Sequence, residues 1–394
     1  MLDKTIQIVL SLIIFGGFYF IALKGFSLTD GQASRKSVII GSIIGIVSLS
    51  LLAAFRAETI GTDIKVYALP IYEVSKAYSL GDLLANSPNA ILYSFMAWIV
   101  SHTIDNFQLF LFFVQVSILV PVVIYLKKNQ HMHLVSNAML IFLFLYFPMT
   151  FNIMRESMAA AFMLLSSYYM LNKRWPTFII MFTVAMLCHP SALIGLLMLI
   201  LVYRSTALVA NKSKAKYIGL IIISGAVLLI AVNWVSIASW AINTVHILPS
   251  SFKYYITIFS TEQKDRLIGK QYFFDLGIAN YIEVAFRIAI FFLIRKRLKN
   301  EKSFEATFLR NANTFNVLIY LFLFLIFKTS YIYRLTMYLD YLNIVSLSYG
   351  STGMKNLRCT KTDALVLITT FAFFIIYYFI FGCHEVIPYK FVWN

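Results

Sequence analysis

The sequence has few charged residues, which make up 13% of its 394 positions, and their formal net charge is +16. Soluble chains carry about 25% charged residues. Hydrophobic residues make up 60% of the chain, and many apolar runs approach the roughly 20 residues that cross a bilayer. The composition therefore excludes an ordinary soluble domain. It predicts an all-α, polytopic integral membrane protein that forms a single domain over residues 1–394.

Cysteines and the common catalytic motifs are also scarce. Cys188, Cys359 and Cys383 stand far apart, so neither a disulfide framework nor a metal site is indicated. The sequence has no Walker loop, no dinucleotide glycine fingerprint, no Gly-x-Ser-x-Gly elbow and no His-Glu-x-x-His pair. These absences argue against ATP-driven transport, redox chemistry and metalloprotease activity, and we expect no cofactor. We attribute the positive charge to membrane-protein loops and not to nucleic-acid binding.

Twelve apolar segments are predicted to cross the membrane, the first of them as a retained span and not a signal peptide. They are 5–23, 37–54, 107–126, 133–149, 155–171, 176–188, 191–203, 217–241, 278–294, 313–328, 335–350 and 363–381. The apolar segment 90–104 is interpreted as an amphipathic or re-entrant helix on the outer side, because only then do the basic clusters share one side. The positive-inside rule makes that side cytoplasmic and places both termini outside.

Two connections need a specific interpretation. Residues 176–203 lie between two basic clusters with His189-Pro190 in the middle, which predicts a hairpin of two short helices broken at Pro190. The alternative, one long kinked helix, inverts the topology that follows. Long outer loops are predicted at about 55–106 and 242–277, and long structured loops on one side of a protein often carry function.

The stretch Asn152-Ile-Met-Arg155-Glu156 opens an otherwise apolar helix. Asn152 is a plausible N-cap, and a helix from about Ile153 places Arg155 in its first turn. Free N–H groups, the helix dipole and the guanidinium then face the same water, which is suited to binding an anion. The alternative is an arginine that reaches out to lipid headgroups.

Other polar residues are predicted at the same outer level. Arg56 and Asp63 follow the second span, His189 lies at the hairpin tip, and Arg334 follows the tenth span. Three arginines from distant segments form an outward cationic pocket if their helices are neighbours, and arginine suits a diphosphate because its planar fork makes paired hydrogen bonds.

Several of these residues have alternative interpretations. His189 is a candidate base, a sugar ligand or a structural residue, and Asp63 caps a loop or binds a hydroxyl. Glu58 and Asp63 are also considered as a carboxylate pair. Glu283 and Arg287, four residues apart within a span, are interpreted as a salt bridge.

An ordered set of short motifs resembles the EpsG/Wzy-type polymerases of bacterial surface polysaccharide. The motifs span about residues 55–340, and one departure is Glu156, where that group often has glutamine. In order they are Arg56…Gly61-Thr-Asp63…Tyr67, Asn152-x-x-Arg155-Glu156, Leu187-Cys-His189-Pro-Ser-Ala-Leu-Ile and Tyr333-Arg334…Tyr338.

The resemblance implies a GT-C-like membrane glycosyltransferase on the outer face of the bacterial cytoplasmic membrane. Such an enzyme transfers a growing glycan from an undecaprenyl-diphosphate carrier to another lipid-linked repeat unit, without metal or nucleotide. Catalytic roles then fall to His189, Asp63, Arg155 and Arg334, with the arginines stabilising the departing diphosphate. Substrate contacts are expected from Arg56, Tyr67, Asn152, Glu156, Tyr338 and, in the second long loop, Arg266.

The expected partners are the undecaprenyl-diphosphate-linked oligosaccharide and the lipid bilayer, with a chain-length regulator and a flippase as further candidates and no nucleic acid. Two other functions are weighed against the polymerase. One is a flippase for the same lipid-linked oligosaccharide, which also needs an arginine-lined cavity. The other is a glycan O-acyltransferase, which requires a cytoplasmic acyl-donor site that the sequence does not show.

Overall fold

The computed structural model describes residues 4–86, 90–210, 277–327, 332–350 and 360–393, and these are helical throughout apart from turns and one isolated β-bridge. The predicted span 217–241, most of the predicted loop 242–277, and Arg266 lie outside the described residues. The helices are α1 Lys4–Ser27, α2 Arg35–Ala54, α3 Leu69–Ala77, α4 Leu80–Asn86, α5 Ile91–Thr103, α6 Phe107–Lys128, α7 Val135–Leu145, α8 Met154–Leu171, α9 Trp175–Cys188, α10 Ala192–Ala210, α14 Ile278–Arg297, α15 Phe304–Phe327, α16 Ile332–Asp340, α17 Leu342–Ser348 and α18 Lys361–Phe373.

Several of these helices are long and apolar enough to cross a bilayer, which makes this a multi-pass membrane protein. In the part of the chain that the structure describes they number five, and shorter apolar helices pack beside them. The prediction of twelve crossings and of a GT-C-like fold is not tested by this arrangement. The five are Lys4–Ser27, Arg35–Ala54, Phe107–Lys128, Phe304–Leu325 and Lys361–Ile380.

The first two helices pack closely because small residues line their contact. A Cβ built on Gly25 of α1 comes within 2.8 Å of the carbonyl oxygen of Gly41 in α2. Small residues allow membrane helices to approach in this way. Ser34 starts α2 by accepting a hydrogen bond from the Ser37 N–H, the local capping that the sequence favours there.

The hairpin predicted for residues 176–203 is confirmed. α9 ends at Cys188, His189 has extended backbone, and α10 begins at Ala192. The ring of Trp175 at the start of α9 lies 6.3 Å from that of Tyr203 in α10, so the two helices run back along each other. The alternative of one long kinked helix is therefore wrong.

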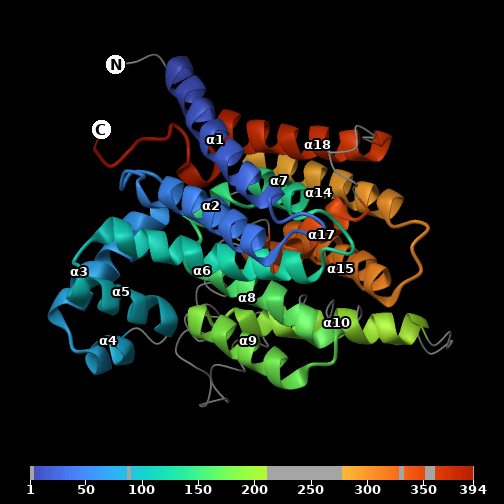
Figure 1. Cartoon of the computed structure of the whole chain (residues 1–394), viewed down its shortest axis with the longest axis horizontal. Helices are drawn as coiled ribbons and strands as arrows, with labels where there is room; N and C mark the ends of the chain where they lie inside the picture. The colour runs from blue at the N-terminus through green and yellow to red at the C-terminus, as the bar shows by residue number, and fades with distance from the viewer. Residues whose placement is uncertain (1–3, 87–89, 211–276, 328–331, 351–359, 394) are drawn as a thin grey trace.

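The predicted outer loop 55–106 is folded into helices. A π-helical turn, Ile64–Ala68, leads into α3, and α5 packs against α3, α6 and α9 at the left of Figure 1. A helix over 90–104 was expected, and α5 covers Ile91–Thr103. Its position relative to the membrane stays a prediction.

The surroundings of the two ends of helix α8 differ in chemistry. At one end, Lys127 donates to the carbonyl oxygen of Thr29 in the α1–α2 connection, and Lys128 lies 5.2 Å from the ring centroid of Tyr168 near the end of α8. Arg155 lies in the first turn of α8, and the 18 residues of this helix span about 27 Å. Basic connections and the Arg155 region therefore lie at opposite ends of α8, as the sequence predicts, while the side of the membrane that each faces stays a prediction.

Candidate functional site

The start of α8 is held by the segment that follows α2. The Met154 N–H donates to Asp63 Oδ2 at 3.3 Å, and the Asp63 N–H donates to Asn152 Oδ1 at 3.2 Å. The prediction that Asn152 caps α8 is wrong, because Ile153 occupies the cap position and makes no side-chain bond. Asp63 supplies the capping carboxylate from a distant part of the sequence, where negative charge is favoured by the helix dipole.

Gly61 makes this contact sterically possible. Its φ is +80°, and a Cβ built on it comes within 2.6 Å of the carbonyl oxygen of Phe151. A left-handed backbone angle and a close backbone approach both favour glycine. Residues 61–63 can therefore lie directly against residues 151–154.

Arg155 projects from the first turn of α8 onto an aromatic face. The centre of its guanidinium lies 4.0 Å from the ring centroid of Tyr67, which is 40% exposed. Cation–π contacts of this kind are worth about 0.5–2 kcal/mol. Among the described residues no carboxylate lies within ion-pair distance of Arg155, and its buried Nε has no hydrogen-bond partner. The guanidinium is held by Tyr67 while keeping hydrogen-bonding capacity for a ligand.

Glu156 joins Arg334 and His189 across three segments. Arg334 Nη1 donates to Glu156 Oε1 at 2.9 Å, and His189 Nε2 lies 3.9 Å from the same oxygen. Glu156 and His189 are buried, whereas the Arg334 side chain is 23% exposed. Glu156 therefore offsets the charge of Arg334 and fixes it at the edge of the site.

The bonds to His189 define its orientation. The Ser191 N–H donates to His189 Nδ1 at 3.3 Å, and Ser191 Oγ lies 2.6 Å from both Nδ1 and the Tyr338 hydroxyl. Because Nδ1 accepts a hydrogen bond, the ring proton belongs on Nε2, toward Glu156. Burial is the largest cause that lowers the pKa of His189. In this arrangement Nε2 faces Glu156 at 3.9 Å, and the accepting nitrogen Nδ1 is already used by Ser191.

Arg56 is more deeply packed than the other two arginines. Its guanidinium donates to the carbonyl oxygens of Ala53 and Phe151 and lies 4.6 Å from the Phe151 ring centroid. Burial, the largest cause, lowers the pKa of Arg56 to about 10. Its contacts hold the end of α2 against the segment before α8.

The two carboxylates of the cluster have different environments. Burial, and after it the negative charge of Glu156, raises the pKa of Asp63 to about 7. Glu58 is exposed while Asp63 is buried, so the two carboxylates considered as a pair from the sequence have unlike surroundings. The carboxylate that influences Asp63 is Glu156.

A family comparison covers this whole region. The family model that matches the chain is described as the EpsG family, and the match runs over residues 39–391. The chain belongs to the EpsG family. No curated protein and no solved structure matches it. The matched range of this EpsG-family protein contains the four motifs named from the sequence and extends to the segment that follows α18.

That last segment is a part of the site that sequence reasoning missed. The Gly61 N–H donates to the carbonyl oxygen of Glu385 at 3.0 Å, and Thr62 Oγ1 donates to Glu385 Oε2 at 2.9 Å. Arg56 and Phe391 form the isolated β-bridge. His384 and Glu385, which follow the last apolar segment, were the available signal, but nothing in their spacing pairs them with residues 56–62.

Tyr93 was also missed, because it lies inside an apolar stretch assigned to a membrane-dipping helix. It is 1% exposed, and its hydroxyl has no hydrogen-bond partner among the described residues. Arg155, Asp63 and Arg56 are its electrostatic neighbours. The Nε atoms of Arg56 and Arg155 are likewise buried, with no hydrogen-bond partner in the part of the chain that the structure describes. Unused donors gathered at a helix N-terminus are suited to receiving an anion.

The described residues offer no comparable metal centre. No group of three or more His, Cys, Asp or Glu side chains in the described ranges is arranged to hold a metal ion. Cys188 is buried and Cys383 partly buried, and both are free thiols.

Proposed function

We propose that this EpsG-family protein is a membrane glycosyltransferase that polymerises lipid-linked oligosaccharide repeat units. Its donor is an undecaprenyl-diphosphate-linked glycan, its acceptor is the non-reducing end of a second lipid-linked unit, and lipid diphosphate is the leaving group. The reaction takes place on the outer face of the bacterial cytoplasmic membrane in a GT-C-like fold. Family membership supports a polysaccharide polymerase, and the arrangement of residues supports the finer assignment.

The observation that carries the proposal is the set of unused donors beside Arg155. The Nε atoms of Arg56 and Arg155 and the Tyr93 hydroxyl are buried without hydrogen-bond partners among the described residues, and Arg155 faces the exposed ring of Tyr67. A diphosphate accepts several charge-assisted hydrogen bonds at once, and arginine forks match its geometry. Placed at the start of α8, it also gains the favourable end of the helix dipole.

Chemistry at this site starts with loss of the anomeric C–O bond to the diphosphate. The acceptor hydroxyl oxygen forms the new bond to the anomeric carbon, its proton passes to a base, and the electron pair of the broken bond leaves with the diphosphate. Arg155 and Arg334 stabilise the negative charge that develops there. Tyr67 contacts a sugar or the guanidinium-bound phosphate from the exposed side.

Asp63 suits the base role better than His189 does. A base works best when its pKa lies near the operating pH, and the pKa of Asp63 is raised to about 7. His189 Nδ1 already accepts from Ser191, and Nε2 faces Glu156. We therefore assign His189 and Tyr338 to positioning the Glu156–Arg334 pair, with Asn152 positioning Asp63.

The test uses purified protein in liposomes with a lipid-diphosphate-linked repeat unit, with and without EDTA, and separates the products by size. A ladder of glycan lengths that persists in EDTA and disappears in Arg155→Ala is expected. Arg295→Ala is the matched control, because Arg295 also lies over a ring, that of Phe291 at 5.2 Å, but at the end of α14. Translocation of the lipid across the bilayer without any ladder contradicts the proposal and identifies a flippase.

A further inference from the structure

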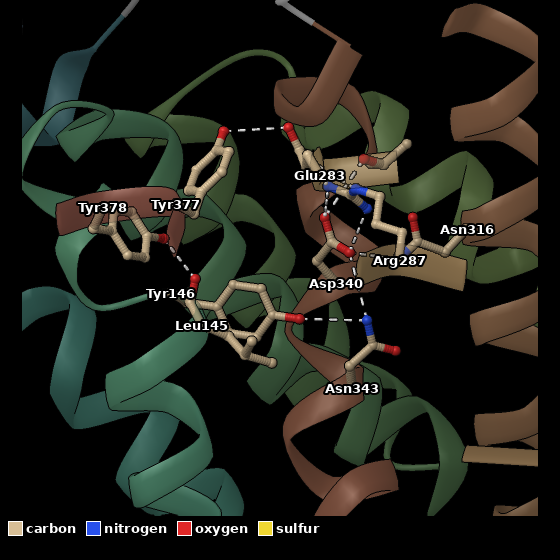
Figure 2. Close-up of polar contacts among 10 residues, drawn as sticks. Leu145, Tyr146, Glu283, Arg287, Asn316, Asp340, Asn343, Tyr377 and Tyr378 are labelled. Carbon is tan, nitrogen blue, oxygen red and sulfur yellow. Dashed lines mark hydrogen bonds and ion pairs between the residues drawn. The ribbon is translucent and has the colours of Figure 1, made fainter. Parts of the chain in front are cut away.

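A second charged cluster is buried among the helices around Arg287 of α14. Figure 2 shows this guanidinium between two carboxylates. Nη1 and Nη2 donate to the two oxygens of Asp340 at 2.8 and 2.9 Å, and Nε donates to Glu283 Oε1 at 2.9 Å. The Glu283–Arg287 salt bridge predicted from the sequence is confirmed. Its stronger partner, Asp340, is more than fifty residues away and was not predicted.

Side chains from neighbouring helices complete the cluster. Asn316 of α15 donates to Asp340 Oδ1 at 2.7 Å, and the Tyr377 hydroxyl donates to Glu283 Oε2 at 3.2 Å. The Arg287 guanidinium also lies 4.0 Å from the ring centroid of Tyr320. Glu283 and Asp340 are buried. Buried ion pairs with additional hydrogen bonds specify one arrangement of helices when every partner is supplied.

Asp340 is the last residue of α16, the short helix that carries Arg334. α16 has nine residues, and the six-residue separation between Arg334 and Asp340 corresponds to about 9 Å along the helix. Arg334 is bonded to Glu156 at the α8 side, and Asp340 is bonded to Arg287 at the other end. The chain leaves the helix after Asp340, since α17 begins at Leu342. Two ion pairs therefore hold the two ends of one short helix.

We propose that Arg287 and Asp340 are positioning residues that set the place of Arg334 in the site. This inference rests on the proposed function, in which Arg334 stabilises the leaving diphosphate. A displacement of about 1 Å in a catalytic group can cost about a hundredfold in rate. Loosening the Asp340 end of α16 releases Arg334 from a fixed geometry without removing its charge or its carboxylate partner.

Helix α14, which carries Arg287, provides a matched control at its C-terminal end. Arg297 Nη2 donates to Asp363 Oδ1 at 2.6 Å, and this pair joins the end of α14 to the start of α18. Its guanidinium also donates to the carbonyl oxygen of Tyr349. Arg297 lies ten residues beyond Arg287, about 15 Å along α14. Both pairs are partly or fully buried Arg–Asp pairs, but only Asp340 shares a helix with Arg334.

The experiment compares Asp340→Asn with Asp363→Asn, each alone and combined with Arg334→Ala. Asp340→Asn is the chosen variant because it leaves Glu283 and Arg287 as a balanced pair, so the protein is expected to fold. We expect Asp340→Asn to lower kcat for glycan elongation by about tenfold to a hundredfold, with little change in KM. In the Arg334→Ala background it should lower kcat no further. Asp363→Asn should have a small effect that multiplies with that of Arg334→Ala.

Hydrogen exchange gives a readout that does not depend on activity. Amide exchange across residues 332–340 should rise in Asp340→Asn and stay unchanged in Asp363→Asn. Unchanged exchange, or losses in kcat that multiply between Asp340→Asn and Arg334→Ala, overturns the positioning role. If wild-type protein gives no elongation, the proposed function fails, and the exchange result still decides whether Asp340 holds α16.

Discussion

Arg155→Lys is the substitution that most sharply tests the proposed binding of a diphosphate at this site. It keeps the positive charge in the first turn of α8 but replaces the planar fork with a single ammonium. In the structure the Arg155 guanidinium lies 4.0 Å from the ring centroid of Tyr67, and its buried Nε has no hydrogen-bond partner. A lysine therefore keeps the Coulomb attraction and loses the paired hydrogen bonds to phosphate.

The magnitude follows from the donors that are lost. Removing one donor to a developing negative charge costs about 10²–10³ in kcat, or about 2.7–4 kcal/mol. Arg155→Ala loses the charge as well, so we expect at least that loss. Arg155→Lys should fall between wild type and Arg155→Ala, with kcat reduced about tenfold to a hundredfold.

The assay is the initial rate of glycan elongation in liposomes over a range of lipid-diphosphate donor concentrations. Arg295→Ala should stay within about twofold of wild type, as expected for a substitution away from the site. Wild-type kcat in Arg155→Lys, together with only a raised KM in Arg155→Ala, contradicts the reasoning. That result assigns Arg155 to ground-state binding or to lipid headgroups.

Three other substitutions address the neighbouring residues. Gly61→Ala should destabilise the protein by about 1–3 kcal/mol, because the added Cβ meets the carbonyl oxygen of Phe151. Gly31→Ala is the control, because Gly31 has a similar φ of +64° but nothing near the added Cβ, and it should lower the melting temperature less. Equal melting temperatures of the two variants contradict the prediction. The pKa of Asp63 is raised to about 7, so its carboxyl group loses its proton as the pH rises through that value. If Asp63 is the base, kcat/KM should rise with pH near 7, and this inflection in the pH profile should vanish in Asp63→Asn. An inflection that persists in Asp63→Asn assigns the titration to another group. Glu156→Gln keeps a hydrogen-bond acceptor for Arg334 but removes the negative charge that offsets it. The site then attracts the diphosphate donor more strongly, so KM for the donor should fall. A variant that folds but is inactive contradicts this and makes the carboxylate of Glu156 essential.

Sequence reasoning located most of this cluster because polar residues near apolar helix ends are rare and therefore informative. Arg56, Asp63, Arg155 and Arg334 were singled out on that basis, and the structure brings them to the start of α8. The hairpin at His189 was predictable because proline breaks a helix and basic residues mark both ends. Their catalytic and binding roles stay predictions.

What could not be predicted depends on contacts between distant segments. Asn152 has the right residue type for a helix cap, but Asp63, which is distant in the sequence, accepts the hydrogen bond from the Met154 N–H instead. Asp340 is a single carboxylate in an apolar run, and only the packing of α14 against α17, which follows Asp340, reveals Arg287 as its partner. Tyr93 resembles any aromatic residue in an apolar helix until its position beside Arg155 is known.

The most direct test of the central claim is to count the lipid diphosphate released for each glycosidic bond formed. Purified wild-type protein in liposomes receives one labelled repeat unit on undecaprenyl diphosphate, and both the glycan products and the free undecaprenyl diphosphate are quantified. The account predicts one undecaprenyl diphosphate released per bond, with both products lost together in Arg155→Ala. Chain growth without release of the lipid diphosphate, or movement of the intact lipid with no chain growth, contradicts it.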